Sequence, residues 1–328
     1  MPLAFGCGMI GQIRYTYSHL TKMTSNSVTV RAPATSANLG PGFDCIGMAL
    51  DIWNELTLTR GKFSVSVVGE GVDMVPLDDR NLVVTGVEAV FNYIGEPVPG
   101  LQYECTNRVP FGRGMGSSSA AIVIGLVAGS AISGADLSKE ELTVLAADIE
   151  GHPDNVAPAI YGGCTIGVRN GDDGWVVDRV SVPEDLNAVL FVPDMLTNTN
   201  ESRGRLPDRI SRTDAVFNIG RSALLVNALS TGRLELLKYA TDDRLHQPQR
   251  TQAFKPMPHL IKAALNGGAH GAFLSGAGPS VLALATGREV TISYEMAETA
   301  RHFGVDGKTM IMAVTQEGAS VISGASGA

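Results

Sequence analysis

The sequence lacks the features that would place the protein in a membrane or on nucleic acid. No apolar run reaches the roughly 18 residues that span a bilayer, and the longest candidate, 120–131, is interrupted by Gly125, Gly129 and Ser130. Positive charge is also scarce, because 25 Lys and Arg stand against 33 Asp and Glu, a net charge of −8. General nucleic-acid binders gain affinity by neutralising phosphates with basic residues. We therefore expect a soluble protein with no nucleic-acid or membrane partner, in which a few placed groups hold any anionic ligand.

Cysteine is rare and scattered. The four cysteines, at positions 7, 45, 105 and 164, form no CxxC pair, which suits reduced thiols in a cytoplasmic protein better than a disulfide framework. Hydrophobic residues make up 44% and charged residues 18%, as in folded globular proteins rather than disordered chains. The 328 residues are enough for about two domains of roughly 150 residues each.

The N-terminal stretch has no acidic residue, and the first one in the chain is Asp44. The apolar stretch 3–11 comes before the basic residues of this segment, whereas a secretory signal has them in the reverse order. A transit segment or a start at Met23 would explain residues 1–23, and we leave them out of the fold as an N-terminal extension. Their GxGxxG pattern has no strand before it and no acidic residue about 20 positions later, so we interpret it as coincidence.

The rest of the chain interleaves strand-like and helical patterns without a repeat or a low-complexity linker. Period-two patterns predict strands that begin near residues 27, 52, 63, 101, 162, 175, 189, 272 and 281. Helical spacing and start signals predict helices at 81–94, 117–133, 137–150, 214–229 and 234–239. The helix at 137–150 opens with a capping box of Ser138 and Glu141. We place a soft domain boundary near 183–188.

Glycine is abundant, with 38 residues against a usual share of ~7%. The most informative cluster is VPFGRGMGSSSAA at 109–121, where Gly112, Gly114 and Gly116 alternate before Ser117–Ser119 open a helix. The unpaired N–H groups of a helix start, next to glycines that allow close approach, form an anion site suited to phosphate. No Lys follows the last glycine, so this is not a Walker A loop. The alternative is a glycine turn that serves only tight strand–helix packing.

Two further segments contain clustered polar groups. In EGHPDN, Glu150, His152, Asp154 and Asn155 crowd a helix end before a predicted loop at 151–158, which is more typical of a ligand pocket than of a solvated loop. Their spacing fits no common zinc pattern, and hard oxygen ligands favour magnesium. In SANLGPGFD, two short polar side chains flank glycines, and an Asx-stabilised turn is the alternative explanation there.

A carboxylate ligand would need a planar cation that donates two hydrogen bonds. Arg203 and Arg250 are the candidates. Thr199 would share a face with Arg203 if the stretch between them is helical. Arg113 puts a third cation inside the glycine loop, either to contact phosphate or to point outward.

The glycine loop, PxxxGMGSSSAA, resembles the phosphate loop of the GHMP kinase superfamily, which includes galactokinase, homoserine kinase, mevalonate kinase and phosphomevalonate kinase. Four more segments resemble the motifs of homoserine kinases in the family's order, namely RAPATSANLGPGFDCIGMAL at 31–50, EGHPDNVAPAIYGG at 150–163, RLHQPQR at 244–250 and GAFLSGAGPSVLAL at 271–284. The resemblance implies an α+β, two-domain GHMP kinase fold. It has a ribosomal-protein-S5-like N-terminal ATP-binding domain, here 24–185, and a ferredoxin-like C-terminal domain, here 186–328.

The resemblance also implies an activity: transfer of the ATP γ-phosphoryl group to the side-chain hydroxyl of L-homoserine, giving O-phospho-L-homoserine for threonine biosynthesis. The phosphate-binding residues would be Pro110, Phe111, Gly112, Arg113, Gly114, Met115, Gly116, Ser117, Ser118, Ser119 and Ala120. Ser118 and Glu150 would be catalytic and hold Mg²⁺, and Asn81 would border the adenine. Homoserine would be bound by Asn38, Asp44, His152, Asn155, Thr199, Arg203 and Arg250.

Two alternatives stay open from the sequence. Another GHMP small-molecule kinase would act on mevalonate, shikimate or threonine, since close analogues differ by only ~1–3 kcal/mol in a pocket. A catalytically inactive nucleotide-binding sensor would share the fold, although the presence of both Ser118 and Glu150 argues against it. The sequence does not determine the oligomeric state and is compatible with a homodimer.

Overall fold

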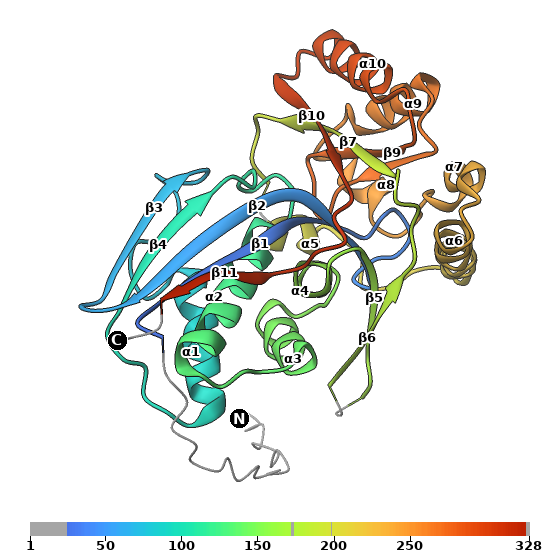
Figure 1. The fold of residues 1–328 in the computed structure, drawn as a ribbon. Coiled ribbons are helices and arrows are strands. Elements are labelled where there is room, and N and C mark those ends of the chain that lie inside the picture. The colour runs from blue at the N-terminus through green and yellow to red at the C-terminus, as the bar shows by residue number, and fades with distance from the viewer. Residues whose placement is uncertain (1–24, 172–173, 198, 326–328) are drawn as a thin grey trace, which may run out of the picture.

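The computed structural model describes residues 25–171, 174–197 and 199–325, so the N-terminal extension predicted for 1–23 lies outside it. This part of the chain forms a seven-stranded sheet and a four-stranded sheet, each with helices packed against it (Figure 1). No helix within these ranges is long and apolar enough to cross a membrane.

The first sheet runs in the order β11, β1, β2, β4, β3, with β5 and then β6 added at one end of β2. Its strands are β1 (Ser27–Ala37), β2 (Ile46–Arg60), β3 (Ser64–Gly69), β4 (Leu101–Asn107), β5 (Cys164–Arg169), β6 (Trp175–Val180) and β11 (Ser320–Ala325). Only the β3–β4 pair is parallel among these described strands. The long β2 pairs with β5 through Ile46–Met48 and with β4 through Glu55–Arg60, so the sheet divides along it.

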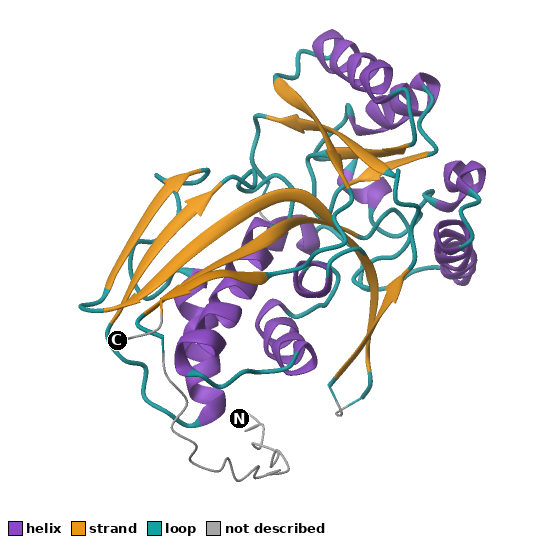
Figure 2. Ribbon diagram, in the orientation of Figure 1, coloured by secondary structure: helices purple, strands orange, loops and turns teal. Residues whose placement is uncertain are grey.

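Four helices cover one face of this sheet (Figure 2). They are α1 (Leu82–Ile94), α2 (Ser117–Ser133), α3 (Lys139–Glu150) and α4 (Val156–Tyr161). The first three confirm predicted helices, including the capping box of Ser138 and Glu141, whereas α4 begins inside the predicted loop at 151–158. The central α2 packs tightly on α1, because a Cβ at Gly125 would lie 2.3 Å from the carbonyl oxygen of Val83. This close packing fixes the position of α2 against α1.

The second sheet runs in the order β10, β7, β9, β8, with antiparallel pairs throughout. Its strands are β7 (Asn187–Pro193), β8 (Gly271–Leu274), β9 (Val281–Ala285) and β10 (Gly307–Ala313). The helices of this half are α5 (Thr199–Gly204), α6 (Arg212–Ser230), α7 (Leu237–Ala240), α8 (Gln247–Arg250), α9 (Met257–Gly267) and α10 (Glu289–His302), with a 3₁₀ turn at Leu234–Leu236.

A hydrophobic core joins the two sheets. Side chains of β7 alternate in direction, so Val189 and Phe191 pack under α9 and α10, while Leu190 packs with Met48 and Ile46 of the first sheet. The predicted division between 185 and 186 falls between β6 and β7, and β11 crosses back to pair with β1. The loops between the two sheets are thereby held against each other, and the candidate site lies among them.

Candidate active site

The glycine loop before α2 has left-handed backbone at alternate positions. Gly112, Gly114 and Gly116 have φ of 64°, 71° and 67°, a region that side chains disfavour. Space is restricted too, since a Cβ at Gly114 would lie 2.3 Å from the carbonyl oxygen of Ser275. The glycines are therefore required by the path of the loop, and the helix that follows presents its free N–H groups at the loop's end.

The carbonyls of the loop are held from its outer side. Three of them accept hydrogen bonds from the second half of the chain: Gly112 from Thr197 N at 2.9 Å, Arg113 from Ser280 Oγ at 2.6 Å, and Gly114 from Ser275 Oγ at 2.6 Å. In a planar trans peptide the N–H points opposite to the C=O. Fixing these carbonyls outward therefore turns the following amides to the other side, as an anion cradle requires.

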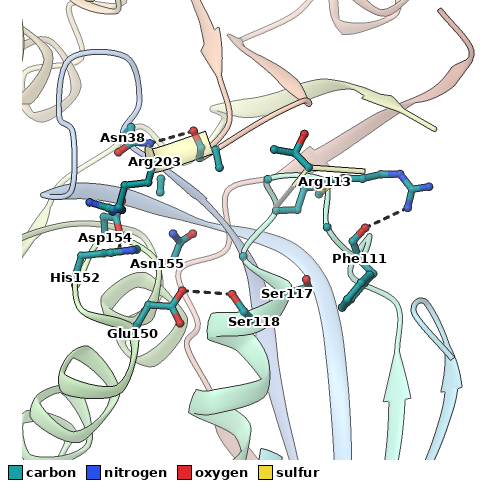
Figure 3. A pocket seen from close by; sticks show the side chains of 18 of the residues that line it. Asn38, Phe111, Arg113, Ser117, Ser118, Glu150, His152, Asp154, Asn155 and Arg203 are labelled. Atoms are coloured by element: carbon teal, nitrogen blue, oxygen red, sulfur yellow. Dashed lines mark hydrogen bonds and ion pairs between the residues drawn. The ribbon is translucent and has the colours of Figure 1, made fainter. Parts of the chain in front are cut away.

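The sequence left open whether Arg113 contacts phosphate or points outward, and the structure shows its side chain bound to backbone carbonyls outside the loop. Its Nε donates to the carbonyl oxygen of Pro193 at 2.8 Å, and Nη2 donates to that of Asp194 at 3.1 Å. Nη1 donates to the carbonyl oxygen of Phe111 at 3.3 Å (Figure 3) and lies 3.6 Å from Glu70 Oε2. Arg113 thus ties the loop to the end of β7.

A cavity of about 490 Å³ opens in front of the loop (Figure 3). The predicted residues that line it are Asn38, Asp44, Phe111, Gly112, Arg113, Gly114, Met115, Gly116, Ser117, Ser118, Glu150, His152, Asn155, Arg203 and Arg250. Pro110, Ser119 and Ala120 are buried beside it rather than lining it. Thr199 begins α5, but its side chain lies outside the described part of the chain.

Glu150, at the C-terminal end of α3, faces the start of α2 across the cavity. Its Oε1 accepts hydrogen bonds from Ser118 Oγ at 3.3 Å and from Ser119 Oγ at 2.9 Å (Figure 3 shows the first). A carboxylate with hydroxyl groups next to it, at the negative end of a helix, is a set of hard oxygen donors that suits Mg²⁺. The residues present therefore fit a magnesium ion.

The two arginines lie near the aromatic ring of Phe43. Arg203 donates to both carboxylate oxygens of Asp44 at 2.7 Å, and this bond raises the pKa of Arg203. The guanidinium carbons of Arg203 and Arg250 lie 5.4 Å and 5.6 Å from the centre of the Phe43 ring. Burial, together with the positive charge of Arg203, lowers the pKa of Arg250 to about 10. Arg203 is thus paired with a carboxylate, whereas the hydrogen-bond partners of Arg250 are a histidine and a backbone carbonyl.

Arg250 is almost entirely buried, and part of its guanidinium is unused. Nη1 donates to the carbonyl oxygen of Gly276 at 2.9 Å and lies 2.9 Å from His246 Nδ1. Nε is buried with no hydrogen-bond partner among the described residues. A buried donor of this kind is costly to leave unpaired.

His152 and Asp154 form a close pair on the opposite wall, with His152 Nδ1 2.5 Å from Asp154 Oδ1. Burial lowers the pKa of His152, but the hydrogen bond and negative charge of Asp154 outweigh burial, so the pKa is raised. One ligand atom each from Asp44, His152 and Asp154 lies within 4.8 Å of the others. Asp154 belongs to the segment that the sequence singled out, although we did not predict a role for it.

Asn38 and Asn155 are both fixed by the protein. Asn38 Oδ1 accepts from the amide of Asp44 at 3.0 Å, and Nδ2 donates to the carbonyl oxygen of Gly276 at 3.1 Å. The turn stabilised by a side chain, which was the alternative explanation for this segment, is thus present on the cavity wall. Asn155 Oδ1 accepts from Thr35 Oγ1 at 2.8 Å.

A second cavity, of about 180 Å³, adjoins the first at Phe111, Ser117 and Ser118. Asn81 lines this second cavity and not the first. Its Oδ1 accepts from Val83 N at 3.1 Å and caps α1, while Nδ2 donates to the carbonyl oxygen of Pro76 at 2.6 Å. Its placement beside the adenine stays a prediction.

Sequence reasoning missed several residues of the site. Phe43, whose ring lies near both arginines, stands next to Asp44 in the SANLGPGFD motif, so its position was the available signal. Thr197 and Leu196 also line the cavity, but they have no motif of their own. His246 lies behind the wall and is absent from the lining altogether.

Comparisons with known proteins identify relatives of this chain. The family described as GHMP kinases N terminal domain matches residues 81–163, and that described as GHMP kinases C terminal matches 225–302. A homoserine kinase of Desulfitobacterium hafniense is 43% identical over 297 residues, covering 90% of this chain and 100% of the relative. One of Trichormus variabilis is 40% identical over 299 residues, covering 90% and 99%.

Solved structures also resemble this chain in fold. The homoserine kinase from Cytophaga hutchinsonii superposes with a TM-score of 0.82 at 29% identity, covering 94% of this chain and 100% of that one. A mevalonate kinase of L. major in complex with R-mevalonate gives 0.66 at 15% identity, covering 89% and 98%, a likeness of fold alone.

Proposed function

Since the chain belongs to the homoserine kinase family of GHMP kinases, we infer that it transfers the γ-phosphoryl group of ATP to the side-chain hydroxyl of L-homoserine. The products are ADP and O-phospho-L-homoserine, in threonine biosynthesis. The α+β, two-domain GHMP kinase fold is confirmed by the same comparisons.

One observation carries the assignment of roles within the site. The cavity of about 490 Å³ is bounded by the glycine loop on one wall and by Asp44, Arg203 and Arg250 on another. We propose that a polyanion and a small amino acid bind together in this open cavity with their reacting ends adjacent. Phosphoryl transfer leaves little covalent work to the protein, and catalysis consists mainly of alignment and charge neutralisation.

The loop amides are proposed to bind the ATP phosphates. Residues 112–119 place backbone N–H groups at the start of the 17-residue α2, where the helix dipole favours negative charge. Ser275 and Ser280 donate hydrogen bonds to the loop carbonyls and hold the loop in place. Little rearrangement is therefore needed when phosphate binds. The adjoining cavity lined by Asn81 is proposed for the adenine.

Ser118 and Glu150 are proposed to hold Mg²⁺. When bound, the ion offsets charge on the phosphate oxygens. Within the chain itself, Glu150 fixes the hydroxyls of Ser118 and Ser119 at the helix start, so the donor set is preassembled.

Arg250 is proposed to bind the carboxylate of homoserine, with Arg203 beside it. The unpartnered Nε of Arg250 and the adjacent Nη2 form the guanidinium edge that meets a carboxylate with two parallel hydrogen bonds. Asp44, which lines the cavity and pairs with Arg203, is suited to the ammonium group, while Asn38, His152 and Asn155 orient the rest of the substrate. Thr199, at the start of α5, is proposed for the same role. No general base is assigned, since Asp44 binds substrate rather than removing a proton.

A coupled assay of ADP release tests the function. The purified chain with ATP and Mg²⁺ is expected to turn over L-homoserine with kcat/KM at least about tenfold above L-threonine, mevalonate or shikimate. Mass spectrometry would identify O-phospho-L-homoserine. Preference for another acceptor would make the chain a different GHMP kinase, and no turnover with any acceptor would favour the sensor.

The chain is further proposed to act in the cytoplasm, where its substrates are small metabolites. For the oligomeric state, a homodimer is the prediction to test. Size-exclusion chromatography with light scattering would report twice the 34.4 kDa of one chain for a dimer.

A further inference from the structure

A fully buried histidine lies directly behind Arg250. His246 has no exposed surface, and its Nε2 lies 3.6 Å from Asp243 Oδ2 in addition to its hydrogen-bond partner. Nε2 lies 2.7 Å from the carbonyl oxygen of Gly40, and Nδ1 lies 2.9 Å from Nη1 of Arg250. A carbonyl only accepts and a guanidinium only donates. The two partners therefore select the neutral ring with its proton on Nε2, so that Nδ1 accepts from Arg250.

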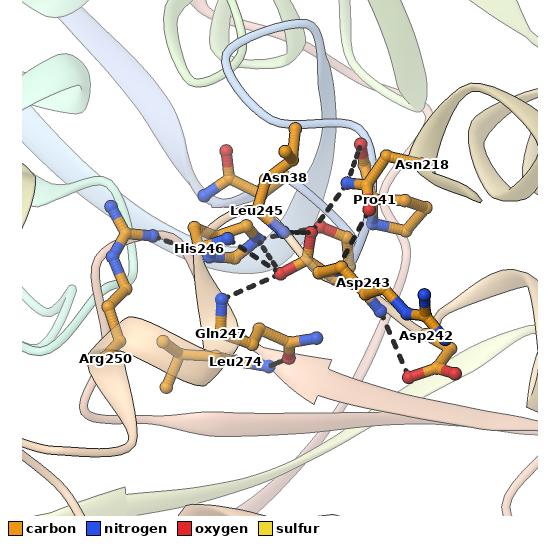
Figure 4. A network of polar contacts seen from close by, with 12 residues as sticks. Asn38, Pro41, Asn218, Asp242, Asp243, Leu245, His246, Gln247, Arg250 and Leu274 are labelled. Carbon is orange, nitrogen blue, oxygen red and sulfur yellow. Dashed lines mark hydrogen bonds and ion pairs between the residues drawn. The ribbon is translucent and has the colours of Figure 1, made fainter. Parts of the chain in front are cut away.

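The turn that holds this ring is wound around a buried carboxylate (Figure 4). Asp243 accepts hydrogen bonds from four donors: the amides of Leu245, His246 and Gln247 at 2.9, 3.0 and 2.7 Å, and Asn218 Nδ2 at 2.7 Å. Gln247 Oε1 in turn accepts from the amide of Leu274 in β8. The ring is thus fixed to the second sheet and to the Gly40 turn, which lies 206 residues away in sequence.

The contact determines which edge of Arg250 remains free. Nη1 carries two hydrogens, and His246 and the carbonyl of Gly276 account for both. The edge formed by Nε and Nη2 is left for a ligand, and Nε has no partner among the described residues.

We propose that His246 is a positioning residue for substrate binding, whose Nδ1 fixes the guanidinium of Arg250 so that its Nε and Nη2 edge faces the homoserine carboxylate. This rests on the proposed function, in which Arg250 binds that carboxylate. The charged groups facing the ring are Asp243, Arg250 and Asp44. Burial lowers the pKa of His246 and the charge of Arg250 adds to this, against the opposing charges of Asp243 and Asp44. The ring is therefore a neutral acceptor at physiological pH.

Two isosteric variants separate the positioning role from a structural one. In His246→Asn the side-chain oxygen takes the place of Nδ1 and keeps the bond to Arg250, whereas in His246→Gln the side-chain amide takes the place of Nε2 and keeps only the bond to Gly40. We expect His246→Gln to raise the homoserine KM by about tenfold and His246→Asn by no more than about threefold, with the ATP KM changed less than about twofold in both. His270→Asn, at a partly buried histidine bonded to Thr286, is the matched control.

Repeating both variants in an Arg250→Ala background completes the test. There we expect no further increase in homoserine KM from either variant, because the group that His246 positions is gone. If His246→Asn is impaired as much as His246→Gln, or if either adds its full effect to Arg250→Ala, His246 acts on stability alone and the inference is overturned. If Arg250→Ala itself leaves homoserine KM unchanged, the carboxylate assignment fails instead.

Discussion

At the scale of single residues, the two arginines of the site differ in whether they have a charged partner. Arg203 is neutralised by Asp44, whereas Arg250 is buried with only neutral partners in hydrogen-bond contact. A substrate carboxylate is proposed to supply the charged partner that the hydrogen bonds of Arg250 do not include. Glu150, by contrast, is shared by two hydroxyls at the helix start.

Glu150 is the residue whose loss should act most on the chemical step. Glu150→Gln keeps the size of the side chain but removes the charge that faces Ser118, so we expect kcat to fall about a hundredfold with homoserine KM changed little. Steady-state kinetics with both substrates would measure this. Glu140→Gln, at an exposed position in the first turn of the same helix, is the control. Equal losses in both variants would remove Glu150 from the catalytic machinery.

The pair of His152 and Asp154 predicts a pH-dependent stability. Because the pKa of His152 is raised in the folded chain, its stabilising effect is fully present below its ordinary pKa of 6.5 and is lost as pH rises through the raised value. The difference in Tm between the unmodified chain and His152→Gln should therefore shrink between about pH 5.5 and about pH 8.5. Differential scanning calorimetry would measure it, and a difference that grows over this range contradicts the assigned pair.

At the scale of elements, the glycine loop depends on contacts from distant parts of the chain. Gly114→Ala would place a Cβ 2.3 Å from the Ser275 carbonyl oxygen, at a φ of 71°. Gly232 has a φ of 68° and open space around the position of a Cβ, so Gly232→Ala has only the free-energy cost of the left-handed backbone. We expect Gly114→Ala to raise the ATP KM by more than about tenfold, while Gly232→Ala costs only about 1–2 kcal/mol of stability. Equal ATP KM values in the two variants would mean that loop packing does not shape the phosphate site.

Local sequence signals were enough for some elements and not for others. The helices α1 and α3 have side-chain N-caps and α2 directly follows the glycine loop, and the predicted ranges of all three are confirmed within two residues. The start of the short α4 was expected as a loop, because Gly151 and Pro153 stop the preceding helix. The tie of Arg113 to Pro193 and the bond of His246 to Gly40 join segments 80 and 206 residues apart, which no local pattern reveals.

At the scale of the whole molecule, the site exists only where the two sheets meet. The first half of the chain contributes the glycine loop, Asp44 and Glu150, and the second contributes Arg203 and Arg250. The resemblance of motifs predicted which residues meet, since those motifs lie in all parts of the chain. The distances between these residues depend on the hydrophobic core that the two sheets share, and the sequence pattern alone does not reveal that core.

Ligand binding should therefore stabilise the molecule as a unit. A non-hydrolysable ATP analogue and L-homoserine, each at about 100 times its Kd, should each add about 2.7 kcal/mol to the free energy of unfolding. We expect a raised Tm for each ligand and a larger rise for both together. In Arg250→Ala the rise from homoserine should be lost and that from the nucleotide kept, and loss of both would contradict separate subsites.

The most direct measurement is a crystal structure of the chain with a non-hydrolysable ATP analogue, Mg²⁺ and L-homoserine. We predict the triphosphate against the amides of residues 112–119, and the amino-acid carboxylate on the Nε and Nη2 edge of Arg250 with its hydroxyl directed at the γ-phosphorus. A nucleotide bound away from the glycine loop, or a homoserine carboxylate that contacts neither arginine, would contradict the account.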